Sequence, residues 1–418
     1  MSARSAVIEP IVLQYAEEAS FLWLLRDAAV GAPHYSLADL VKLDDRIEAH
    51  LDGLRIAGDE GWDICQNELQ WLEAGEIFTA AVLAFEAGDV ARIQPVLELA
   101  RGSVELSRGL VSALGWLSYE KIAPRISQLT AAGDADLCRI GIAAGCAHSR
   151  NPGKVLIDSV SSDDTPLRAR ALRAAGQLGR TDLLPHLRSH LNDPDDKCRF
   201  SAAWSAAVLG DNPAIDVLKS MAMVDSSFLC PAMEMALRRM SLADALGWQR
   251  QLAQQSDLSR TAVIAVGVIG DPVLVPWLIE QIPVSELARA AGESFTMITG
   301  ADIALLDLEG DKPERFESGP TENPEDENIS LDPDEDLPWP DAELIRHWWD
   351  AHKKDMPTGT RYLLGKPMTA ESLAAALRTG HQRQRAAAAL ELAIRQTAGK
   401  KPLFEVRAPG VRQRQLLR

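Results

Sequence analysis

The stretch from Asp196 to Leu218 reads DKCRFSAAWSAAVLGDNPAIDVL, and its pattern recurs through much of the chain. An acid at its start suits the exposed amides in the first turn of a helix. Small and apolar residues follow, and Gly210 can end that helix in a left-handed conformation. Pro213 suits the first turn of a second, shorter helix that carries an apolar stripe. The stretch therefore predicts two helices in about 30 residues.

The first helix of this unit is marked by an arginine that follows an acidic residue by three positions. Such arginines recur at intervals of 31, 29, 31, 61 and 29 residues; they are Arg108, Arg139, Arg168, Arg199, Arg260 and Arg289, with a threonine in place of the acid before Arg168. A second series lies ten or eleven residues later and consists of Gly179, Gly210, Gly270 and Gly300. Both series skip the same unit, near Met240. Two helices of this length cannot bury their apolar faces alone, so neighbouring units must stack.

These repeats predict an all-α fold, an α-solenoid of short HEAT-like repeats of about 30 residues. The box Ser36–Asp39 and Gly58 mark the start and end of a helix before the repeats. The predicted divisions are 1–87 for a helical N-terminal cap, 88–301 for the solenoid, 302–341 for a disordered, proline-rich acidic loop, and 342–418 for a C-terminal helical segment with a basic tail.

The arginine series is expected to be structural. Each arginine can pair with an acid of its own or an adjacent repeat and so hold the repeats in register. The alternative is an arginine-lined groove that receives an acidic partner.

Charge is distributed unevenly near the C-terminus. Residues 302–341 hold fifteen acidic and two basic residues, whereas the chain from Arg378 onward holds ten basic and two acidic residues. We expect the basic tail to meet the acidic loop within the molecule; the alternative is that Arg412 and Arg414 dock an acidic partner. Tryptophans 339, 348 and 349 flank the acidic loop. They are expected to anchor the C-terminal helices, with a partner-binding patch of Trp339, Trp348 and Trp349 as the alternative.

Bulk composition excludes several classes of function. A formal net charge of −17 opposes binding to nucleic acid or to an anionic membrane. The start of the chain lacks the pattern of a signal peptide, and no apolar stretch is long enough to span a membrane. Five cysteines without a Cys-x-x-Cys pair indicate reduced, mostly buried thiols. The prediction is a cytoplasmic protein.

No motif predicts catalysis, a metal or a cofactor. Asp332, Asp334, Asp336 and Glu343 have the spacing of a calcium loop, but Leu337 replaces the glycine that the turn needs. His186 and His190 have metal-like spacing without the glutamate of a zinc protease, and are expected to be surface histidines. The Gly365-Lys366 pair lacks the remainder of a phosphate loop. We therefore expect a protein that is not an enzyme.

Several segments outside the repeats carry a family resemblance. They are Leu43–Arg46, Ala49–Leu54, Leu337–Asp341, Arg361–Gly365, Gln384–Ala393 and Pro402–Glu405. In these segments the chain resembles a proteobacterial HEAT-repeat family encoded in type VI secretion gene clusters, beside spike, spike-tip and effector genes. The resemblance covers nearly the whole chain and brings no catalytic residues. It implies an accessory role in loading an effector or spike in the bacterial cytoplasm.

The leading hypothesis is therefore a non-enzymatic protein-binding scaffold, an adaptor or chaperone whose partner is a secretion effector, a spike or a spike-tip component. One alternative is an immunity protein that neutralises a toxin. Another is an enzyme of the HEAT-like class, either a lyase or a DNA glycosylase, although the net charge disfavours a DNA enzyme. The sequence leaves the oligomeric state open.

Overall fold

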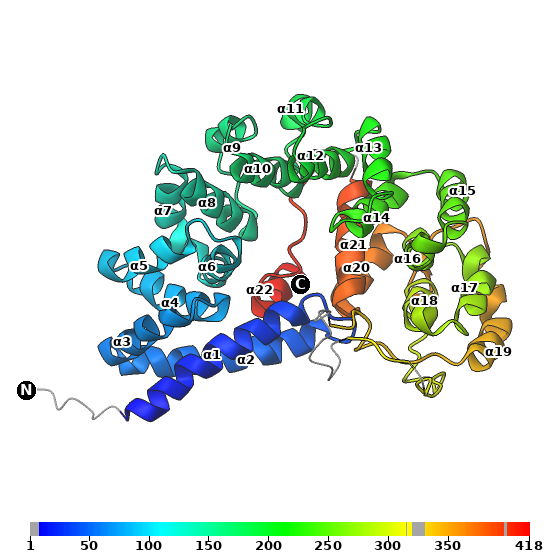
Figure 1. Ribbon diagram of the computed structural model, residues 1–418, viewed down its shortest axis with the longest axis horizontal. Helices are drawn as coiled ribbons and strands as arrows, with labels where there is room; N and C mark the ends of the chain where they lie inside the picture. The colour runs from blue at the N-terminus through cyan, green and yellow to red at the C-terminus, as the bar shows by residue number, and fades with distance from the viewer. Residues whose placement is uncertain (1–7, 315, 320–330, 397–398) are drawn as a thin grey trace, which may run out of the picture. The chain divides into compact units, whose positions relative to one another are not determined.

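The computed structural model describes residues 8–314, 316–319, 331–396 and 399–418 (Figure 1). Within these residues, twenty-two α-helices accompany one two-stranded antiparallel sheet, β1 (Tyr362–Leu363) and β2 (Lys366–Pro367), and five short 3-10 helices. The α-helices are α1 (Glu9–Ala29), α2 (Leu37–Ala57), α3 (Asp59–Glu68), α4 (Ala74–Ala87), α5 (Val90–Ala100), α6 (Val104–Trp116), α7 (Tyr119–Thr130), α8 (Ala135–Ala147), α9 (Lys154–Ser159), α10 (Thr165–Gln177), α11 (Leu184–Ser189), α12 (Asp196–Leu209), α13 (Pro213–Met221), α14 (Leu229–Arg239), α15 (Leu242–Ala253), α16 (Ser259–Ile269), α17 (Val275–Gln281), α18 (Ser285–Thr299), α19 (Ala342–His352), α20 (Ala370–Thr379), α21 (Gln382–Arg395) and α22 (Gly410–Leu416). The 3-10 helices are η1 (Leu69–Trp71), η2 (Thr181–Leu183), η3 (Ser256–Leu258), η4 (Pro272–Leu274) and η5 (Lys353–Asp355). The prediction of an all-helical fold of paired, consecutively packed helices, the HEAT-like α-solenoid type, is confirmed.

The chain forms two compact units. Unit 1 comprises residues 1–31, 35–214 and 395–418, and unit 2 comprises residues 32–34 and 215–394. The boundary falls inside α13, so the predicted single solenoid over 88–301 is divided between the units. The predicted C-terminal segment is also divided, because residues from 395 onward pack with unit 1.

Unit 1 is built on one row of stacked helices. In this row α1 packs on α4, α4 on α6, α6 on α8, α8 on α10, and α10 on α12 (Figure 1). The shorter helices α5, α7, α9 and α11 alternate with them along the chain, so the row holds the first helix of each pair. Helices α1 and α4 belong to this row although both precede residue 88, so the stacking continues into the segment predicted to be the N-terminal cap.

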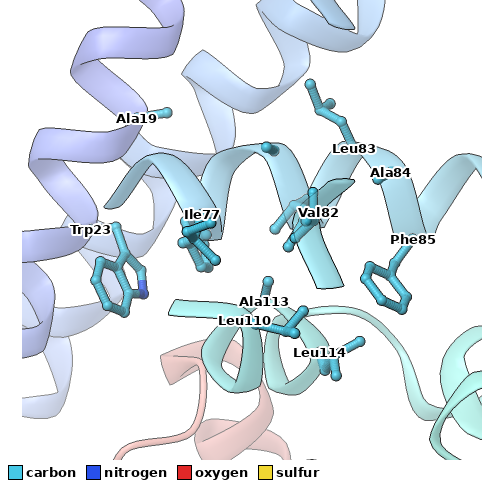
Figure 2. Close-up of a cluster of buried hydrophobic side chains, with 14 of the residues drawn as sticks. Ala19, Trp23, Ile77, Val82, Leu83, Ala84, Phe85, Leu110, Ala113 and Leu114 are labelled. Atoms are coloured by element: carbon cyan, nitrogen blue, oxygen red, sulfur yellow. The ribbon is translucent and has the colours of Figure 1, made fainter. Parts of the chain in front are cut away.

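Small residues let the first helices of unit 1 approach closely. Figure 2 shows Trp23, Ile77 and Leu110 in the core that α1, α4 and α6 share. A Cβ atom on Gly109 would overlap the carbonyl oxygen of Ala74 in the neighbouring helix. A side chain is therefore excluded at this contact, which lets the two helix backbones lie close together.

The helix ends follow the predicted signals. Asp195 caps α12 by accepting from the backbone N–H of Cys198, one position before the acid at which we expected the helix to begin. Gly210 ends that helix at φ 102°, a left-handed conformation that favours glycine. Ser36 and Asp39 form the capping box of α2, which ends at Gly58. These positions confirm the helix boundaries expected from the sequence.

Unit 2 repeats the stacking in its own row, in which α14 packs on α16 and α16 on α18. The unit that both sequence series skip is α14, where Cys230 and Pro231 lie in the first turn. Helix α19 packs on α17, and its Ile345 and Trp349 enter the core around Phe295.

The acidic loop, predicted to be disordered over residues 302–341, makes backbone contacts in the parts that the structure describes. The backbone N–H of Asp341 donates to Leu308 at 2.9 Å, and the N–H of Gly310 donates to Trp339 at 2.8 Å. Glu309 and Pro340 form an antiparallel bridge. The local composition gave no sign of these contacts because their partners lie far away in sequence. Residue 315 and residues 320–330 lie outside the described residues.

No helix in the described parts of the chain is both long and apolar enough to cross a membrane. The five cysteines are free thiols; four are buried and Cys230 is half-buried. Burial raises the pKa of Cys65 to about 12. The expectation that the cysteines are mostly buried is confirmed.

Candidate functional site

The six arginines of the series all lie in the first helices: Arg108 in α6, Arg139 in α8, Arg168 in α10, Arg199 in α12, Arg260 in α16 and Arg289 in α18. We call them the ladder arginines. They fall into two groups that differ in the origin of the carboxylate that each one binds.

In unit 1 the ladder arginines bind carboxylates of the repeats. Arg108 pairs with Glu105 at 2.9 Å, and Arg139 pairs with Asp136 at 3.2 Å. Arg108 also binds Asp27 of α1, and Arg139 donates to Ser107 of the preceding repeat. These contacts correspond to the register role expected from the sequence.

Asp193 binds two ladder arginines of unit 1, Arg168 and Arg199. Its buried carboxylate accepts from Arg168 at 3.2 Å, from the ring of His190 at 2.9 Å and from the backbone N–H of Asp195 at 3.0 Å. Its carbonyl accepts from Arg199 at 2.6 Å. Burial raises the pKa of Asp193, but these hydrogen bonds outweigh burial and hold the pKa below its ordinary value. His190 is therefore a half-buried partner of this carboxylate and not the free surface histidine that we expected.

The end of the chain crosses unit 1 at the C-terminal ends of its first helices. Arg412 donates to the carbonyls of Gly115, Leu117 and Ala147, at the ends of α6 and α8. The backbone N–H of Leu403 donates to Gln177, at the end of α10. Carbonyls at a helix end have no partner in their own helix, and a cation there also suits the helix dipole. We call residues 403–413 the tail segment.

A buried ion pair anchors the tail segment. Arg26 and Asp44 pair at 2.9 Å, and each side chain is 5 % exposed. Arg26 also donates to the carbonyls of Arg407 and Ala408, at 2.7 and 3.0 Å. The second carboxylate oxygen of Asp44 accepts from the backbone N–H of Gly410 at 2.6 Å. The pair therefore binds the chain terminus through backbone groups on both sides.

In unit 2, too, a segment from late in the chain binds the carbonyls at the ends of the first helices. Arg361 donates to the carbonyls of Leu237 and Met240 at the end of α14, and to Ile269 at the end of α16. The following β1–β2 hairpin binds the ends of α16 and α18, since the N–H of Tyr362 donates to Gly270 and that of Leu364 to Met297. Gly365, once considered as part of a phosphate loop, lies in the hairpin turn at φ 71°.

The ladder arginines of unit 2 bind the acidic loop. Arg260 donates to both carboxylate oxygens of Asp334, at 2.5 and 2.7 Å. Arg289 donates to the carboxylate of Asp332 at 2.5 Å and to the carbonyl of Asp334 at 2.9 Å. We call residues 331–341 the strap.

These contacts correct one expectation. The strap carboxylates bind arginines of unit 2, whereas Arg407 and Arg412 of the basic tail bind groups of unit 1. These residues therefore do not form the predicted pairing of the acidic loop with the basic tail. Asp332 and Asp334 serve as partners of guanidinium groups and not as calcium ligands. Among the described residues, no group of three His, Cys, Asp or Glu side chains is placed to hold a metal ion.

The three tryptophans lie in different surroundings. Trp339 covers Arg289, whose guanidinium carbon is 4.5 Å from the ring centroid. Trp348 packs edge-on against Phe295, and Trp349 is 6 % exposed in the core of unit 2. Trp349 is therefore buried away from any partner in this structure, whereas Trp339 is half-exposed.

Arg412 and Arg414, the two arginines considered as a docking site for an acidic partner, also differ in their surroundings. Arg414 is exposed, while Arg412 is half-buried with its donors on helix carbonyls. Burial lowers the pKa of Arg412. Arg414 is the one of the two whose side chain is open to solvent.

Each unit has a cavity beside its ladder. In unit 2 a cavity of about 450 Å³ is lined by Arg238, Arg260, Arg383, Glu234 and the strap residue Asp334, among others. Burial raises the pKa of Glu234. In unit 1 a cavity of about 250 Å³ lies between the first helices and the tail segment. Both are bounded on one side by a segment from late in the chain.

Arg26, Asp44 and Arg361 had not been singled out as individual contacts in the sequence. Arg26 and Asp44 hold the tail segment, and Arg361 binds the ends of two helices. Asp44 and Arg361 lie within segments that carry the family resemblance, whereas Arg26 lies in none of them. The carbonyls that Arg361 binds belong to the backbone and require no particular residue type, so the sequence pattern could not reveal these contacts.

No curated protein is similar enough in sequence to count as a relative of this chain. The family model for HEAT repeats matches residues 153–238, which run from the start of α9 to the end of α14. This part of the chain therefore consists of HEAT repeats.

Proposed function

We propose that this chain is a non-enzymatic protein-binding scaffold that acts as an adaptor or chaperone for an effector or spike-tip component of a type VI secretion system. The observation that carries the binding role is the HEAT-repeat match over residues 153–238, since stacked repeats offer extended surfaces for other proteins. The secretion role rests on the sequence resemblance described above.

The chemistry beside the ladders supports binding over catalysis. The guanidinium groups there are matched with carboxylates, as in Arg383 with Glu293 at 2.8 Å and Arg238 with Glu391 at 3.1 Å. Arginine is well suited to recognise carboxylates of a partner, because its planar guanidinium can bind a carboxylate through two hydrogen bonds.

Co-expression with the proteins encoded beside the gene tests this proposal. We expect the full chain to co-purify in a fixed ratio with one spike, spike-tip or effector protein. Loss of effector delivery on deletion of the gene, with the effector still produced, is the matching result in cells. A folded chain that co-purifies with none of these proteins would contradict the secretion role. Rescue of growth from a neighbouring toxin, without any effect on delivery, would favour an immunity protein instead.

A further inference from the structure

The strap binds the ladder of unit 2 as a peptide ligand would. It provides an extended Asp-x-Asp element: Asp332 reaches Arg289, and Asp334 reaches Arg260 in a bidentate pair. Both carboxylates are well shielded, with side chains 12 % and 6 % exposed. Bidentate pairs between arginine and carboxylate are among the strongest and most specific polar contacts in proteins.

An aromatic contact completes this recognition. Trp339 lies over the guanidinium of Arg289, and Phe316 lies 5.3 Å from it on another side. The two rings meet edge-on at 4.9 Å. Arg289 thus contacts a carboxylate, a backbone carbonyl and two aromatic rings. Arginine commonly recognises acidic segments that contain an aromatic residue through contacts of these kinds.

The ladder arginines of unit 1 show that such an arginine can find a carboxylate partner without a strap. Arg108 and Arg139 pair with the acid three residues before them. The same acids exist in unit 2, where Asp257 precedes Arg260 and Glu286 precedes Arg289. Both acids are exposed. The unit 2 arginines therefore have two sets of available carboxylates, and the structure pairs them with the strap.

The space beside the strap can accommodate more than the strap occupies. The cavity of about 450 Å³ is lined by Pro333 and Asp334 on one side, and by Arg238, Arg383 and Leu390 on the other. A partner segment that replaced the strap would meet the apolar side chain of Leu390 and the guanidinium groups of Arg238 and Arg383, which pair with Glu391 and Glu293.

We propose that Arg260 and Arg289 form a docking site for an acidic peptide segment of a partner protein, and that the strap is an internal pseudo-ligand that occupies this site until such a segment displaces it. The partner segment carries two carboxylates two residues apart, followed by an aromatic residue. This inference rests on the proposed role as a protein-binding scaffold and names the site, the partner chemistry and the regulation.

Competition by a tethered segment has a measurable consequence. A tethered strap acts at an effective concentration on the order of millimolar, so a free peptide in solution competes poorly with it. The apparent affinity is reduced by the fraction of molecules whose site is open. Weakening the strap should therefore tighten the binding of a free peptide.

The test uses the full chain and a fluorescent peptide LDPDEDLPW, the sequence of residues 331–339. The strap variant Asp332→Asn/Asp334→Asn removes the carboxylates that bind the ladder. The control variant Glu335→Gln/Asp336→Asn removes the same charge from exposed neighbours. We expect the strap variant to bind the peptide at least about tenfold more tightly than either the wild type or the control variant. Adding Arg260→Gln to the strap variant should reverse this gain.

Equal affinities of the strap variant and the control variant would overturn the proposal and leave the strap as a structural element. If the strap variant does not fold, hydrogen exchange of the wild type decides. Excess peptide should accelerate exchange in residues 331–341 and leave α16 and α18 protected; unchanged exchange in the strap would overturn the proposal. No secretion component enters either measurement, so failure here and failure of the proposed function can be told apart.

Discussion

Asp44→Asn should release the chain terminus from unit 1. The substitution keeps the shape of the side chain but removes its charge. One of the two asparagine polar atoms must be an NH₂ group, so either Arg26 or the N–H of Gly410 faces a donor instead of an acceptor. The guanidinium of Arg26 then stays buried without its counter-charge.

The magnitude follows from the burial of this pair. Breaking a buried ion pair by removing one partner costs about 3–5 kcal/mol. Arg26 keeps the carbonyls of Arg407 and Ala408, which places the expected loss at the lower end, about 3 kcal/mol. Such a loss corresponds to a roughly 100-fold change in the equilibrium for opening of the tail segment, since 1.4 kcal/mol is tenfold.

Native-state hydrogen exchange of the full chain provides the assay. Peptides that cover residues 403–418 should exchange roughly 100-fold faster in Asp44→Asn than in the wild type. Asp45→Asn is the matched control, because it removes the same charge from the next, exposed position of α2. Equal exchange in the two variants would refute the role assigned to the pair.

Three further predictions concern packing, register and pH. Gly109→Ala should destabilise unit 1 by about 2 kcal/mol, because overpacking against Ala74 outweighs the better helix propensity; Gly247→Ala, with open space around it, should be neutral or stabilising in the same urea titration. Asp193→Asn should lower the free energy of unfolding by about 2–3 kcal/mol, because several donors around the buried carboxylate would then lack an acceptor. A thermal melt that matches the wild type would contradict this. The strap should dissociate in acid: burial raises the pKa of Asp332, but the hydrogen bond from Arg289 and other contacts hold it below its ordinary value of 3.8. A depressed carboxylate pKa stabilises the docked strap fully above about pH 4 and loses that contribution as the pH falls further, so protease cleavage within residues 331–341 should accelerate only below pH 4.

The repeated helices could be predicted from sequence because their signals are local. The alanine-rich run before Gly210 and the proline at residue 213 mark the two helices of a repeat without reference to the rest of the chain. The repeat that lacks a ladder arginine could also be recognised in the sequence, because Cys230 and Pro231 stand where α14 begins. Periodicity and capping are properties of neighbouring residues, so one sequence suffices to read them.

The division into two units and the placement of the late segments could not be predicted in this way. Asp332 and Asp334 meet arginines 43 and 74 residues away, respectively, and Gly410 meets Asp44 at a separation of 366 residues. No local pattern encodes such partners. Composition was misleading for the strap, because a proline-rich acidic segment is typical of disorder unless a matching set of cations is folded nearby.

The sequence also could not separate the register role of the ladder from the binding role. Arg139 and Arg260 occupy equivalent positions after equivalent acids, yet the structure pairs one with its own repeat and the other with the strap. Only the geometry shows that the arginine of one unit binds an acid of its own repeat while that of the other binds the strap.

Hydrogen exchange of the full chain, free and bound to the partner that co-purifies with it, decides whether a partner displaces the strap. We expect binding to protect α16 and α18 around Arg260 and Arg289 and to expose the strap. A complex in which protection falls only on α15 and α17, with the strap still protected, would contradict it.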